Sequence, residues 1–384
     1  MRAPFPPAWT YRNPVRVIFA PDAFSHLDDY VSSDRAALVT SPGFQRRGLV
    51  ATVRAALGPR LVAVIDDVEP NPAMLDIEAQ GERVRASAPD VLVALGGGST
   101  IDTAKALARL LARPPGTRLS ELLDDLEPEA RHFALPVIAV PTTSGTGAEV
   151  TPFATLWDYE QGKKRSIAGQ DLYPRLALLD PHLTLPLPPE VTISSGLDAV
   201  SHALESIWNR RASAVSLALA TESLQRSLHA LARVKEAPED ARARAEMLQA
   251  STLAGLAISQ TRTALAHAIS YPLTIGFGLP HGLACSFTLP ALLVFNAASD
   301  DGRLAELARC LGCPSIGALA GELAELLRGL GADGYLAKYL PDRQSVLALA
   351  DRMFTKGRAE NNLRPASVQD VRAIVGEALD ALRL

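Results

Sequence analysis

The chain has 384 residues, 48% hydrophobic and 21% charged, a composition typical of a globular protein large enough for two domains. Its formal net charge of −4 gives no electrostatic case for nucleic acid or an anionic membrane surface as a partner. No apolar run is long enough to span a membrane and the N-terminal residues lack the apolar core of a secretory signal, so we expect a cytoplasmic protein.

The first half of the chain alternates short apolar runs with helical segments. The apolar runs predict strands, and the segments between them predict helices that include one beginning near Gln45 and one covering 74–87. This alternation predicts a doubly wound, Rossmann-like α/β fold with a parallel sheet, in which ligands bind at the carboxyl ends of the strands. The strands are expected at 9–19, 36–40, 61–65, 91–95, 135–140 and 175–181.

Two glycine-rich loops follow two of these expected strands. A helix expected to begin at Ile101 or Asp102 follows Gly-Gly-Gly-Ser-Thr at 96–100, and the second loop, at 141–147, reads Pro-Thr-Thr-Ser-Gly-Thr-Gly. Glycine lets a ligand approach the backbone, and a helix N-terminus offers free N–H groups to a pyrophosphate. Two such loops predict a phosphate-bearing cofactor. The alternative is a purely steric use of glycine, since the first loop is not the G-x-G-x-x-G of dinucleotide-binding folds.

A proline-rich segment at 185–190 separates two parts of different character. We place the domain boundary there, with a Rossmann-like cofactor-binding domain at 1–186 and an all-helical catalytic domain at 187–384. Cys310 and Cys313 form a C-x-x-C, but a zinc ribbon needs a second pair and only Cys285 remains, so we interpret the pair as a helix end. Helices are expected at 195–209, 214–232, 238–257, 304–310, 316–330, 344–354 and 367–382.

Four candidate metal ligands lie in the second part. Asp198 and His202 stand four residues apart in a helical run, so both side chains leave the same helix face. His267 follows another apolar helical run, 253–265, and His281 follows glycines and a proline that end a helix. One carboxylate and three imidazoles suit Fe2+ or Zn2+, which can act as a Lewis acid on a carbonyl or alkoxide oxygen. The alternative for any one of these histidines is a satisfied core or surface position.

These residues also carry a resemblance to a known family. The motif Asp-Ala-x-x-His-Ala-x-Glu at 198–205, with His267 and Pro-His-Gly at 280–282, resembles the iron-dependent alcohol dehydrogenases. Two further signatures of that family match Gly-Gly-Gly-Ser-x-x-Asp-x-Ala-Lys at 96–105 and Pro-Thr-Thr-x-Gly-Thr-Gly-x-Glu at 141–149. The resemblance covers nearly the whole chain. It implies an oxidoreductase acting on CH–OH groups, with a nicotinamide cofactor in the first domain and a divalent metal in the second.

The resemblance assigns roles to single residues. It implies that Asp198, His202, His267 and His281 hold the metal, with His267 and His281 at the catalytic centre. One departure is Tyr271, which stands where the family often has a further histidine. The proton-handling role of that histidine is then unfilled, and we expect Tyr271 to shape the substrate pocket. The implied cofactor contacts are Asn71, Gly96, Gly97, Gly98, Ser99, Asp102, Thr142, Thr143, Gly145, Thr146 and Lys164.

The residue after the second expected strand bears on the choice between NADP(H) and NAD(H). An acidic residue there accepts hydrogen bonds from an adenosine ribose and repels a 2′-phosphate, but this chain has Ser41. Arg46 and Arg47 follow closely and suit a 2′-phosphate. The pattern favours NADP(H), with Ser41 at the cofactor; the alternative is that both arginines are exposed helix residues. For Lys164 the alternative to a cofactor contact is a solvated basic turn.

Within the family, the segments 197–209 and 263–274 resemble the phosphonoacetaldehyde reductase branch. That branch reduces phosphonoacetaldehyde to 2-hydroxyethylphosphonate in phosphonate natural-product pathways. A phosphonate dianion needs cationic partners, and the candidates are Arg262 and Arg364. The alternative for each arginine is a surface or interdomain salt bridge.

Other functions stay open at this point. The chain could reduce short neutral aldehydes or oxidise the corresponding alcohols or diols. A dehydroquinate-synthase-like cyclase shares the architecture but performs a net elimination, and a non-catalytic relative would be expected to have lost a metal ligand, whereas none is lost here. The sheet edge near the N-terminus could pair with a second copy to form a homodimer.

Overall fold

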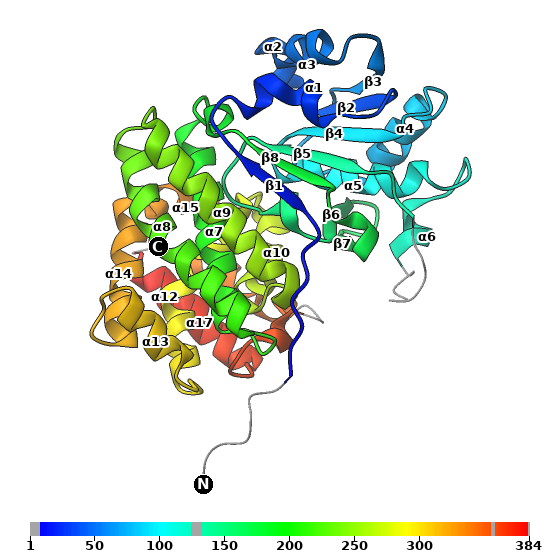
Figure 1. The fold of residues 1–384 in the computed structure, drawn as a ribbon. Coiled ribbons are helices and arrows are strands. Elements are labelled where there is room, and N and C mark those ends of the chain that lie inside the picture. Colours follow the sequence, from blue (N-terminus) through cyan, green and yellow to red (C-terminus); the bar gives the residue numbers. More distant parts are fainter. Residues whose placement is uncertain (1–7, 124–132, 355–357, 383–384) are drawn as a thin grey trace.

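The structure is a computed structural model that describes residues 8–123, 133–354 and 358–382. Within these ranges an N-terminal α/β part and a C-terminal helical part lie side by side (Figure 1). The main strands are β1 (Arg16–Phe19), β2 (Ala36–Thr40), β3 (Leu61–Ile65), β4 (Val91–Gly96), β5 (Val137–Pro141) and β8 (Leu176–Leu179). They form one sheet in the order β1-β8-β5-β4-β2-β3, and all neighbours are parallel. The predicted fold class is confirmed.

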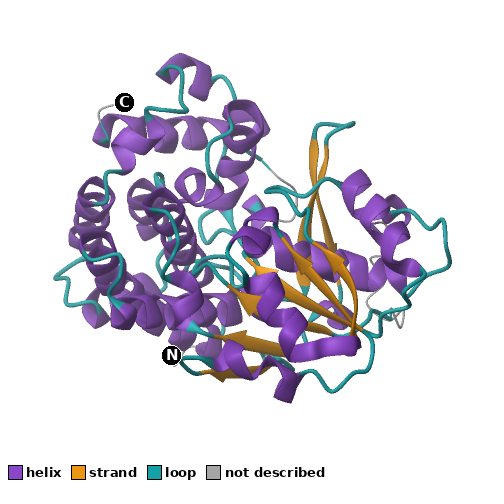
Figure 2. Ribbon diagram, turned by 90° about the horizontal axis from the view of Figure 1, so that it is seen from above, coloured by secondary structure: helices purple, strands orange, loops and turns teal. Residues whose placement is uncertain are grey.

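Helices cover both faces of this sheet, which is why its inner strands are apolar throughout. Along β2, Val39 belongs to one hydrophobic core and Leu38 to the other, because successive side chains of a strand point to opposite faces. Figure 2 shows helices on both sides of the sheet. These helices are α1 (Leu27–Tyr30), α2 (Pro42–Arg46), α3 (Leu49–Leu57), α4 (Met74–Arg85), α5 (Gly98–Leu111) and α6 (Leu119–Leu123).

A separate antiparallel hairpin consists of β6 (Phe153–Asp158) and β7 (Lys163–Ala168). The sequence pattern does not predict it, because Lys-Lys-Arg at the start of β7 has low strand propensity. The N–H of Thr155 in β6 donates to Asp102 Oδ2 of α5 at 2.8 Å. Lys164 is therefore part of a strand, and the interpretation of 163–165 as a basic turn is wrong.

The second part is helical throughout its described residues, as predicted. One hydrophobic core, which includes Trp208 and Phe287, joins its helices. Capping boxes begin α8 at Ser213 and α17 at Ser367. None of the described helices is both long and apolar enough to cross a bilayer. The helices are α7 (Pro189–Ile207), α8 (Ala214–Glu236), α9 (Ala241–Thr261), α10 (Leu265–Phe277), α11 (His281–Ser286), α12 (Leu289–Ala297), α13 (Arg303–Cys310), α14 (Ile316–Gly329), α15 (Ala332–Leu336), α16 (Arg343–Leu347) and α17 (Val368–Ala381).

Two helices of the α/β part begin earlier than expected. α2 begins at Pro42 rather than near Gln45, because the fixed φ of proline suits the first turn of a helix. α5 begins at Gly98 rather than at Ile101 or Asp102. The three glycines thus span the junction, with Gly96 ending β4, Gly97 as the N-cap and Gly98 as the first residue of α5.

The apolar run 253–265 is not one helix. α9 ends at Thr261 and α10 begins at Leu265, with Arg262 between them at φ +62° and ψ 177°. The positive φ breaks the helix, so His267 lies in the first turn of α10 rather than after a helix.

Close backbone contacts fix the α/β part against the helical part. Gly147 has φ +60°, and a Cβ there would lie 2.4 Å from Gly255 Cα in α9. Nearby, Thr252 Oγ1 of α9 donates to the buried Glu149 at 2.9 Å. The second glycine-rich loop therefore packs on the helical part, and the boundary at residues 186 and 187 stays a prediction.

Candidate active site

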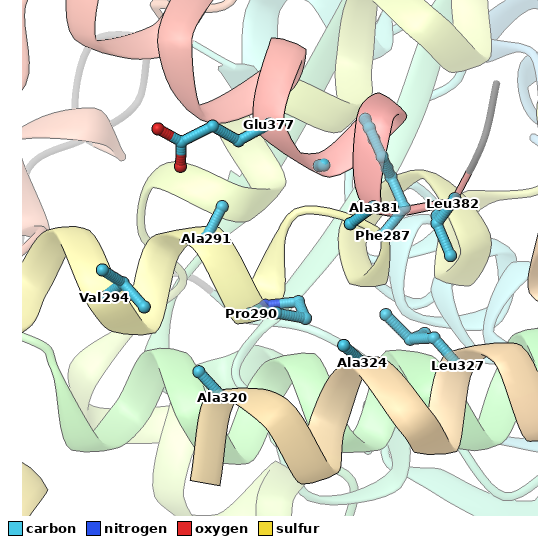
Figure 3. A pocket seen from close by; sticks show the side chains of 11 residues that line it. Phe287, Pro290, Ala291, Val294, Ala320, Ala324, Leu327, Glu377, Ala381 and Leu382 are labelled. Atoms are coloured by element: carbon cyan, nitrogen blue, oxygen red, sulfur yellow. The ribbon is translucent and has the colours of Figure 1, made fainter. Parts of the chain in front are cut away.

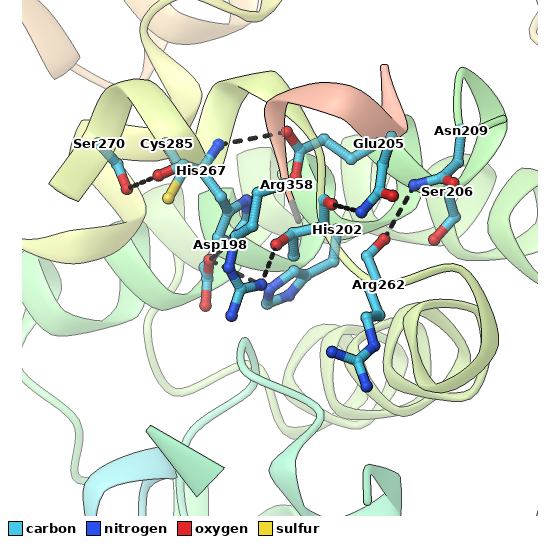
Figure 4. Close-up of polar contacts among 12 residues, drawn as sticks. Asp198, His202, Glu205, Ser206, Asn209, Arg262, His267, Ser270, Cys285 and Arg358 are labelled. Carbon is cyan, nitrogen blue, oxygen red and sulfur yellow. Dashed lines mark hydrogen bonds and ion pairs between the residues drawn. The ribbon is translucent and has the colours of Figure 1, made fainter. Parts of the chain in front are cut away.

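The four predicted metal ligands come together in one cluster, in which Asp198, His202 and His267 are buried and His281 is partly exposed. They lie along α7 and at the starts of α10 and α11. Asp198 Oδ1 lies 3.7 Å from His202 Nε2 and 3.5 Å from His267 Nε2. The ring of His267 lies with its centroid 4.7 Å from that of His202 and 5.2 Å from that of His281. Figure 4 shows Asp198, His202 and His267 converging between the helices.

The partners of two imidazoles fix which ring nitrogen carries the proton. His202 Nδ1 lies 3.2 Å from the carbonyl oxygen of Gly145, and His267 Nδ1 lies 2.7 Å from Glu205 Oε2. A carbonyl or carboxylate oxygen only accepts, so Nδ1 donates in both rings. Each Nε2 faces Asp198 and is left to bind either a proton or a metal, the arrangement found in metal-ligating histidines.

The cluster leaves polar atoms without protein partners. Asp198 Oδ1 and His267 Nε2 are buried and make no hydrogen bond to any described residue. Two unsatisfied buried groups cost about 1–3 kcal/mol each, and a lone pair facing a carboxylate adds repulsion. A divalent cation among these oxygen and nitrogen donors satisfies both atoms, and this ligand type suits Fe2+ or Zn2+.

The charges of the cluster also favour a bound cation. Burial would raise the pKa of Asp198, but His202, His267 and His281 together lower it below its ordinary value. Burial opposes a charge on His267, yet Cys285, Glu205 and Asp198 raise the pKa of this histidine well above its ordinary value. The site therefore favours positive charge despite the burial of Asp198 and His267.

Glu205 and Cys285 are functional candidates that sequence reasoning missed. Glu205 is fully buried and accepts from both the backbone N–H and Nδ1 of His267. Cys285 Sγ lies 3.7 Å from both ring nitrogens of His281. The donor atoms of Asp198, His267, His281 and Cys285 all lie within 4.8 Å of one another. The signal for Cys285 was its helical spacing, four residues after His281.

The two glycine-rich loops lie next to each other at the carboxyl edge of the sheet. Gly96 at the end of β4 pairs with Pro141 at the end of β5. Gly98 packs so closely on Thr146 that a Cβ would lie 2.6 Å from its side chain. No described side chain caps α5, whose N-cap is Gly97. Its first N–H groups are therefore available to an anion such as a pyrophosphate.

Most of the other cofactor candidates surround these loops. The N–H of Asn71 donates to Ser99 Oγ at 3.2 Å, and the N–H of Thr142 donates to the carbonyl of Gly96 at 3.0 Å. A hollow between the hairpin and α10 has Asn71 in its wall. Thr143 packs against Gly97 of the first loop.

Asp102 and Gly145, two other predicted cofactor residues, have protein partners in the structure, and their cofactor roles stay predictions. Asp102 is engaged by Thr155 of the hairpin, and burial raises its pKa to about 6 against the lowering effect of Lys105, Thr155 and Lys164. Gly145 approaches α7, where a Cβ would meet the carbonyl oxygen of Ser195 at 2.4 Å. Since its own carbonyl accepts from His202, Gly145 connects the cofactor loop to the metal cluster.

Tyr271 lies among cations beside the metal cluster. Lys164 Nζ of β7 lies 4.0 Å from the centroid of its ring, and Arg358 Cζ lies 5.6 Å from it. The ring stacks on His281 with centroids 6.3 Å apart. The hairpin thus brings Lys164 next to the cluster. Burial is the main cause that lowers the pKa of His281, and the charge of Lys164 lowers it further.

The remaining candidates are Ser41 and the arginines predicted to bind the cofactor or the substrate, and they have different surroundings. Ser41 is the N-cap residue of α2 and directly follows β2. Arg47 stacks on Phe44 with its Cζ 4.1 Å from the ring centroid. Arg262 is close enough to Arg358 for their charges to interact. Arg364 instead stacks on Phe295 and donates to its carbonyl at 3.3 Å, so the structure gives it a packing role.

A second hollow lies within the helical part (Figure 3). It is lined by apolar side chains such as Phe287, Val294 and Leu327, and Glu377 is the one ionisable residue among its described lining. Its described lining offers no cation and a single carboxylate, which is too few donors for a metal site. The chemistry therefore belongs to the cluster between the two parts.

Comparison with known proteins decides the family. Residues 14–181 match the family model described as iron-containing alcohol dehydrogenase, and residues 192–379 match the C-terminal model of the Fe-containing alcohol dehydrogenase family. The chain belongs to the iron-containing alcohol dehydrogenase family. It is accordingly an oxidoreductase that acts on CH–OH groups, with a nicotinamide cofactor and a divalent metal. The cyclase and non-catalytic alternatives are thereby set aside.

Relatives within the iron-containing alcohol dehydrogenases differ in substrate. A phosphonoacetaldehyde reductase from Streptomyces viridochromogenes is 38% identical over 71% of this chain and 69% of that protein. A sulfoacetaldehyde reductase from Bilophila wadsworthia is 31% identical over 91% of this chain and 93% of that protein. A 1-propanol dehydrogenase from Salmonella typhimurium is 32% identical over 86% of this chain and 89% of that protein. The crystal structure of sulfoacetaldehyde reductase from Bifidobacterium kashiwanohense in complex with NAD+ has a TM-score of 0.87 at 28% identity, covering 97% of this chain and 99% of that one.

Proposed function

We propose that this enzyme reduces phosphonoacetaldehyde to 2-hydroxyethylphosphonate with hydride from NADPH, in a phosphonate biosynthetic pathway. The observation that carries the proposal is the pair of cations, Lys164 and Arg358, at the ring of Tyr271 beside His281. An aldehyde with an anionic group meets opposite charge there, whereas a neutral aldehyde gains nothing from it. The 38% identity to a phosphonoacetaldehyde reductase supports the same substrate.

The chain's own residues have separable roles in this reaction. Asp198, His202, His267 and His281 would hold the metal, and the N-terminus of α5 would bind the cofactor pyrophosphate. When bound, the metal supplies Lewis-acid polarisation of a carbonyl oxygen and the reduced nicotinamide supplies the hydride.

Buried partners keep the imidazoles in the required state. Gly145 and Glu205 hold the protons of His202 and His267 on Nδ1, so that each Nε2 lone pair faces the metal position. Tyr271 forms a wall of the substrate pocket against His281. Asp198 and His267 are buried, and burial strengthens the electrostatic contacts that these side chains make.

Preference for NADP(H) over NAD(H) is part of the proposal. Ser41 leaves the end of β2 without a carboxylate that would repel a 2′-phosphate, and the exposed Arg46 and Arg47 lie at the end of α2. The metal is Fe2+ or Zn2+, since both accept one carboxylate and three imidazoles. Metal analysis of protein loaded with each ion distinguishes them.

The test is NADPH oxidation by metal-loaded protein, followed at the absorbance of the reduced nicotinamide. Parallel reactions contain phosphonoacetaldehyde, sulfoacetaldehyde or propanal, each with NADPH or NADH. Fast oxidation with phosphonoacetaldehyde supports the proposal. Equal rates with propanal contradict the phosphonate substrate and favour the second candidate, a reductase of short neutral aldehydes, which the 32% identity to a 1-propanol dehydrogenase supports.

We also propose a homodimer formed through β1. This strand lies at one edge of the sheet and pairs with β8 alone among the described strands, so its outer backbone groups can pair with a second copy. Sedimentation at several protein concentrations tests this assembly, and a monomer throughout contradicts it.

A further inference from the structure

Three segments that lie far apart in the sequence meet beside the metal cluster. Asn209, just after α7, joins the first two: its Nδ2 donates to the carbonyl of Arg262 at 3.1 Å, and its Oδ1 accepts from the N–H of Arg211 at 3.0 Å. Asn361 joins the third: its Nδ2 donates to the carbonyl of Thr263 at 2.9 Å. The backbone at 209–211, 262–263 and 358–361 is thus held as one unit.

Each of these segments carries at least one arginine: Arg211 follows Arg210 in the first, and Arg262 and Arg358 lie in the second and third. The salt bridges of the described residues include none to Arg211, Arg262 or Arg358, and the charges that act on Arg262 are those of the other two. Burial first, and then Arg358 and Arg211, lower the pKa of Arg262 below its ordinary value. The like charges of these arginines repel one another, and an anion of double charge relieves that repulsion.

The backbone of Arg262 is held in a conformation that normally needs glycine. Its φ of +62° and ψ of 177° lie in a region that side chains with a Cβ avoid. Its carbonyl accepts from Asn209 and from Thr261 Oγ1 at 3.0 Å, and these bonds keep it there. A glycine would adopt this conformation without strain. The advantage of an arginine at this position must therefore come from its guanidinium group.

Arg358 lies next to the residues that border the metal cluster. Arg358 Cζ lies 5.6 Å from the ring centroid of Tyr271, and this ring stacks on His281. Arg358 Nη1 also donates to Thr263 Oγ1, which fixes the direction of its side chain. In Figure 4 both Arg262 and Arg358 extend from the helices toward the side of the site where the α/β part lies.

From this geometry we propose that Arg262 and Arg358, supported by Arg211, form the subsite that binds the phosphonate group of the substrate. The inference rests on the proposed function and adds its specificity-determining residues. The subsite holds the phosphonate while the aldehyde carbon, two bonds away, faces the metal donors and the nicotinamide. A dianion fits this set of guanidinium groups better than a sulfonate of single charge, because the charges are then more fully matched.

The experiment compares two variants with a matched control. Arg262→Gly removes the guanidinium and relieves the backbone strain, and Arg358→Met removes the second guanidinium but keeps the length of the side chain. Arg364→Met is the control, since Arg364 stacks on Phe295 outside the cluster. The readouts are the ratio of kcat/KM for phosphonoacetaldehyde to that for propanal, the melting temperature, and the affinity for 2-hydroxyethylphosphonate measured calorimetrically on metal-loaded enzyme with NADP+.

We expect Arg262→Gly and Arg358→Met each to lower the ratio and the affinity by about 10- to 100-fold, the usual effect of losing a charge-assisted hydrogen bond. Arg364→Met should leave the ratio as it is in the unaltered enzyme. The melting temperature of Arg262→Gly should not fall, which separates loss of the subsite from loss of the fold.

The outcomes separate the subsite from the proposed function. An unaltered ratio and affinity in both variants overturn the subsite, even if the enzyme reduces phosphonoacetaldehyde. An unaltered enzyme that reduces propanal but neither binds nor prefers the phosphonate overturns the proposed substrate first. A preference of the unaltered enzyme for sulfoacetaldehyde, lost in both variants, overturns the phosphonate assignment in favour of a sulfonate.

Discussion

Glu205 accepts two hydrogen bonds from His267, from its backbone N–H at 3.2 Å and from Nδ1 at 2.7 Å. The carboxylate fixes the ring and makes Nε2 more basic toward a metal. We therefore predict that Glu205→Gln weakens metal affinity by about 10- to 100-fold, as is usual for such outer partners. Competition with a chelator of known affinity measures the effect.

Glu222→Gln is the control for this variant, because Glu222 pairs with Arg226 on the surface of α8. Its metal affinity should equal that of the unaltered enzyme. If Glu205→Gln bound metal equally well, the role given to Glu205 in orienting His267 would be wrong.

Two sets of four donors are possible in the metal cluster, and they differ in whether His202 or Cys285 is the fourth ligand. The contact of His202 Nδ1 with Gly145 leaves its Nε2 free, and burial raises the pKa of the Cys285 thiol. We predict that His202→Ala loses stoichiometric metal and that Cys285→Ser keeps it. Cobalt-substituted protein should lack a thiolate-to-metal charge-transfer band; such a band, abolished by Cys285→Ser, would place the sulfur on the metal.

Metal removal should lower stability as well as activity. A ligand that binds only the folded state stabilises it by an amount that grows with its concentration relative to Kd, about 2.7 kcal/mol at a hundredfold excess over Kd. Chelator-treated protein should therefore melt at a lower temperature, and added Fe2+ or Zn2+ should restore it. An identical melting temperature with and without metal contradicts a filled site at 198–281.

Ser41 gives a direct test of cofactor choice. A carboxylate at this position accepts hydrogen bonds from a ribose and repels a 2′-phosphate. Ser41→Asp should lower the preference for NADPH over NADH by about tenfold or more, an effect of about 1.4 kcal/mol. Ser41→Ala, which adds no charge, is the matched control, and an equal shift in both variants would show that the charge is not responsible.

Tyr271 is predicted to act through its ring. Lys164 and Arg358 lie over the ring of Tyr271, and such cation–π contacts contribute about 0.5–2 kcal/mol. Tyr271→Ala should therefore raise KM for phosphonoacetaldehyde by about tenfold, and Tyr271→Phe far less. A collapse of kcat in Tyr271→Phe alone would instead identify the hydroxyl as a proton donor.

Residue spacing within a single helix or loop predicts those parts of the site that come from one element. Asp198 and His202 share a face of α7 because they are four residues apart, and the two glycine loops lie at neighbouring strand ends because parallel strands share one carboxyl edge. His281 was placed by the glycines and proline before it. These relationships depend on periodicity and turn chemistry, which are visible in a single sequence.

Contacts between segments that lie far apart in the sequence cannot be predicted from local spacing. Arg358 reaches Tyr271 only because 358–361 is hydrogen-bonded to the break after α9, and no local pattern encodes that pairing. The sequence does not predict the hairpin that carries Lys164, because its basic residues are equally typical of a solvated turn. Arg364 was a plausible anion ligand by type, but the structure turns it onto Phe295.

The central claim is reduction of a phosphonate-bearing aldehyde at this metal site. The most direct measurement is phosphorus NMR of a reaction containing metal-loaded enzyme, NADPH and phosphonoacetaldehyde, with cofactor oxidation recorded in the same sample. We predict one new resonance, that of 2-hydroxyethylphosphonate, in an amount equal to the NADPH oxidised, and none after chelation. An unchanged phosphonoacetaldehyde resonance, in enzyme that oxidises NADPH with propanal, would contradict the account.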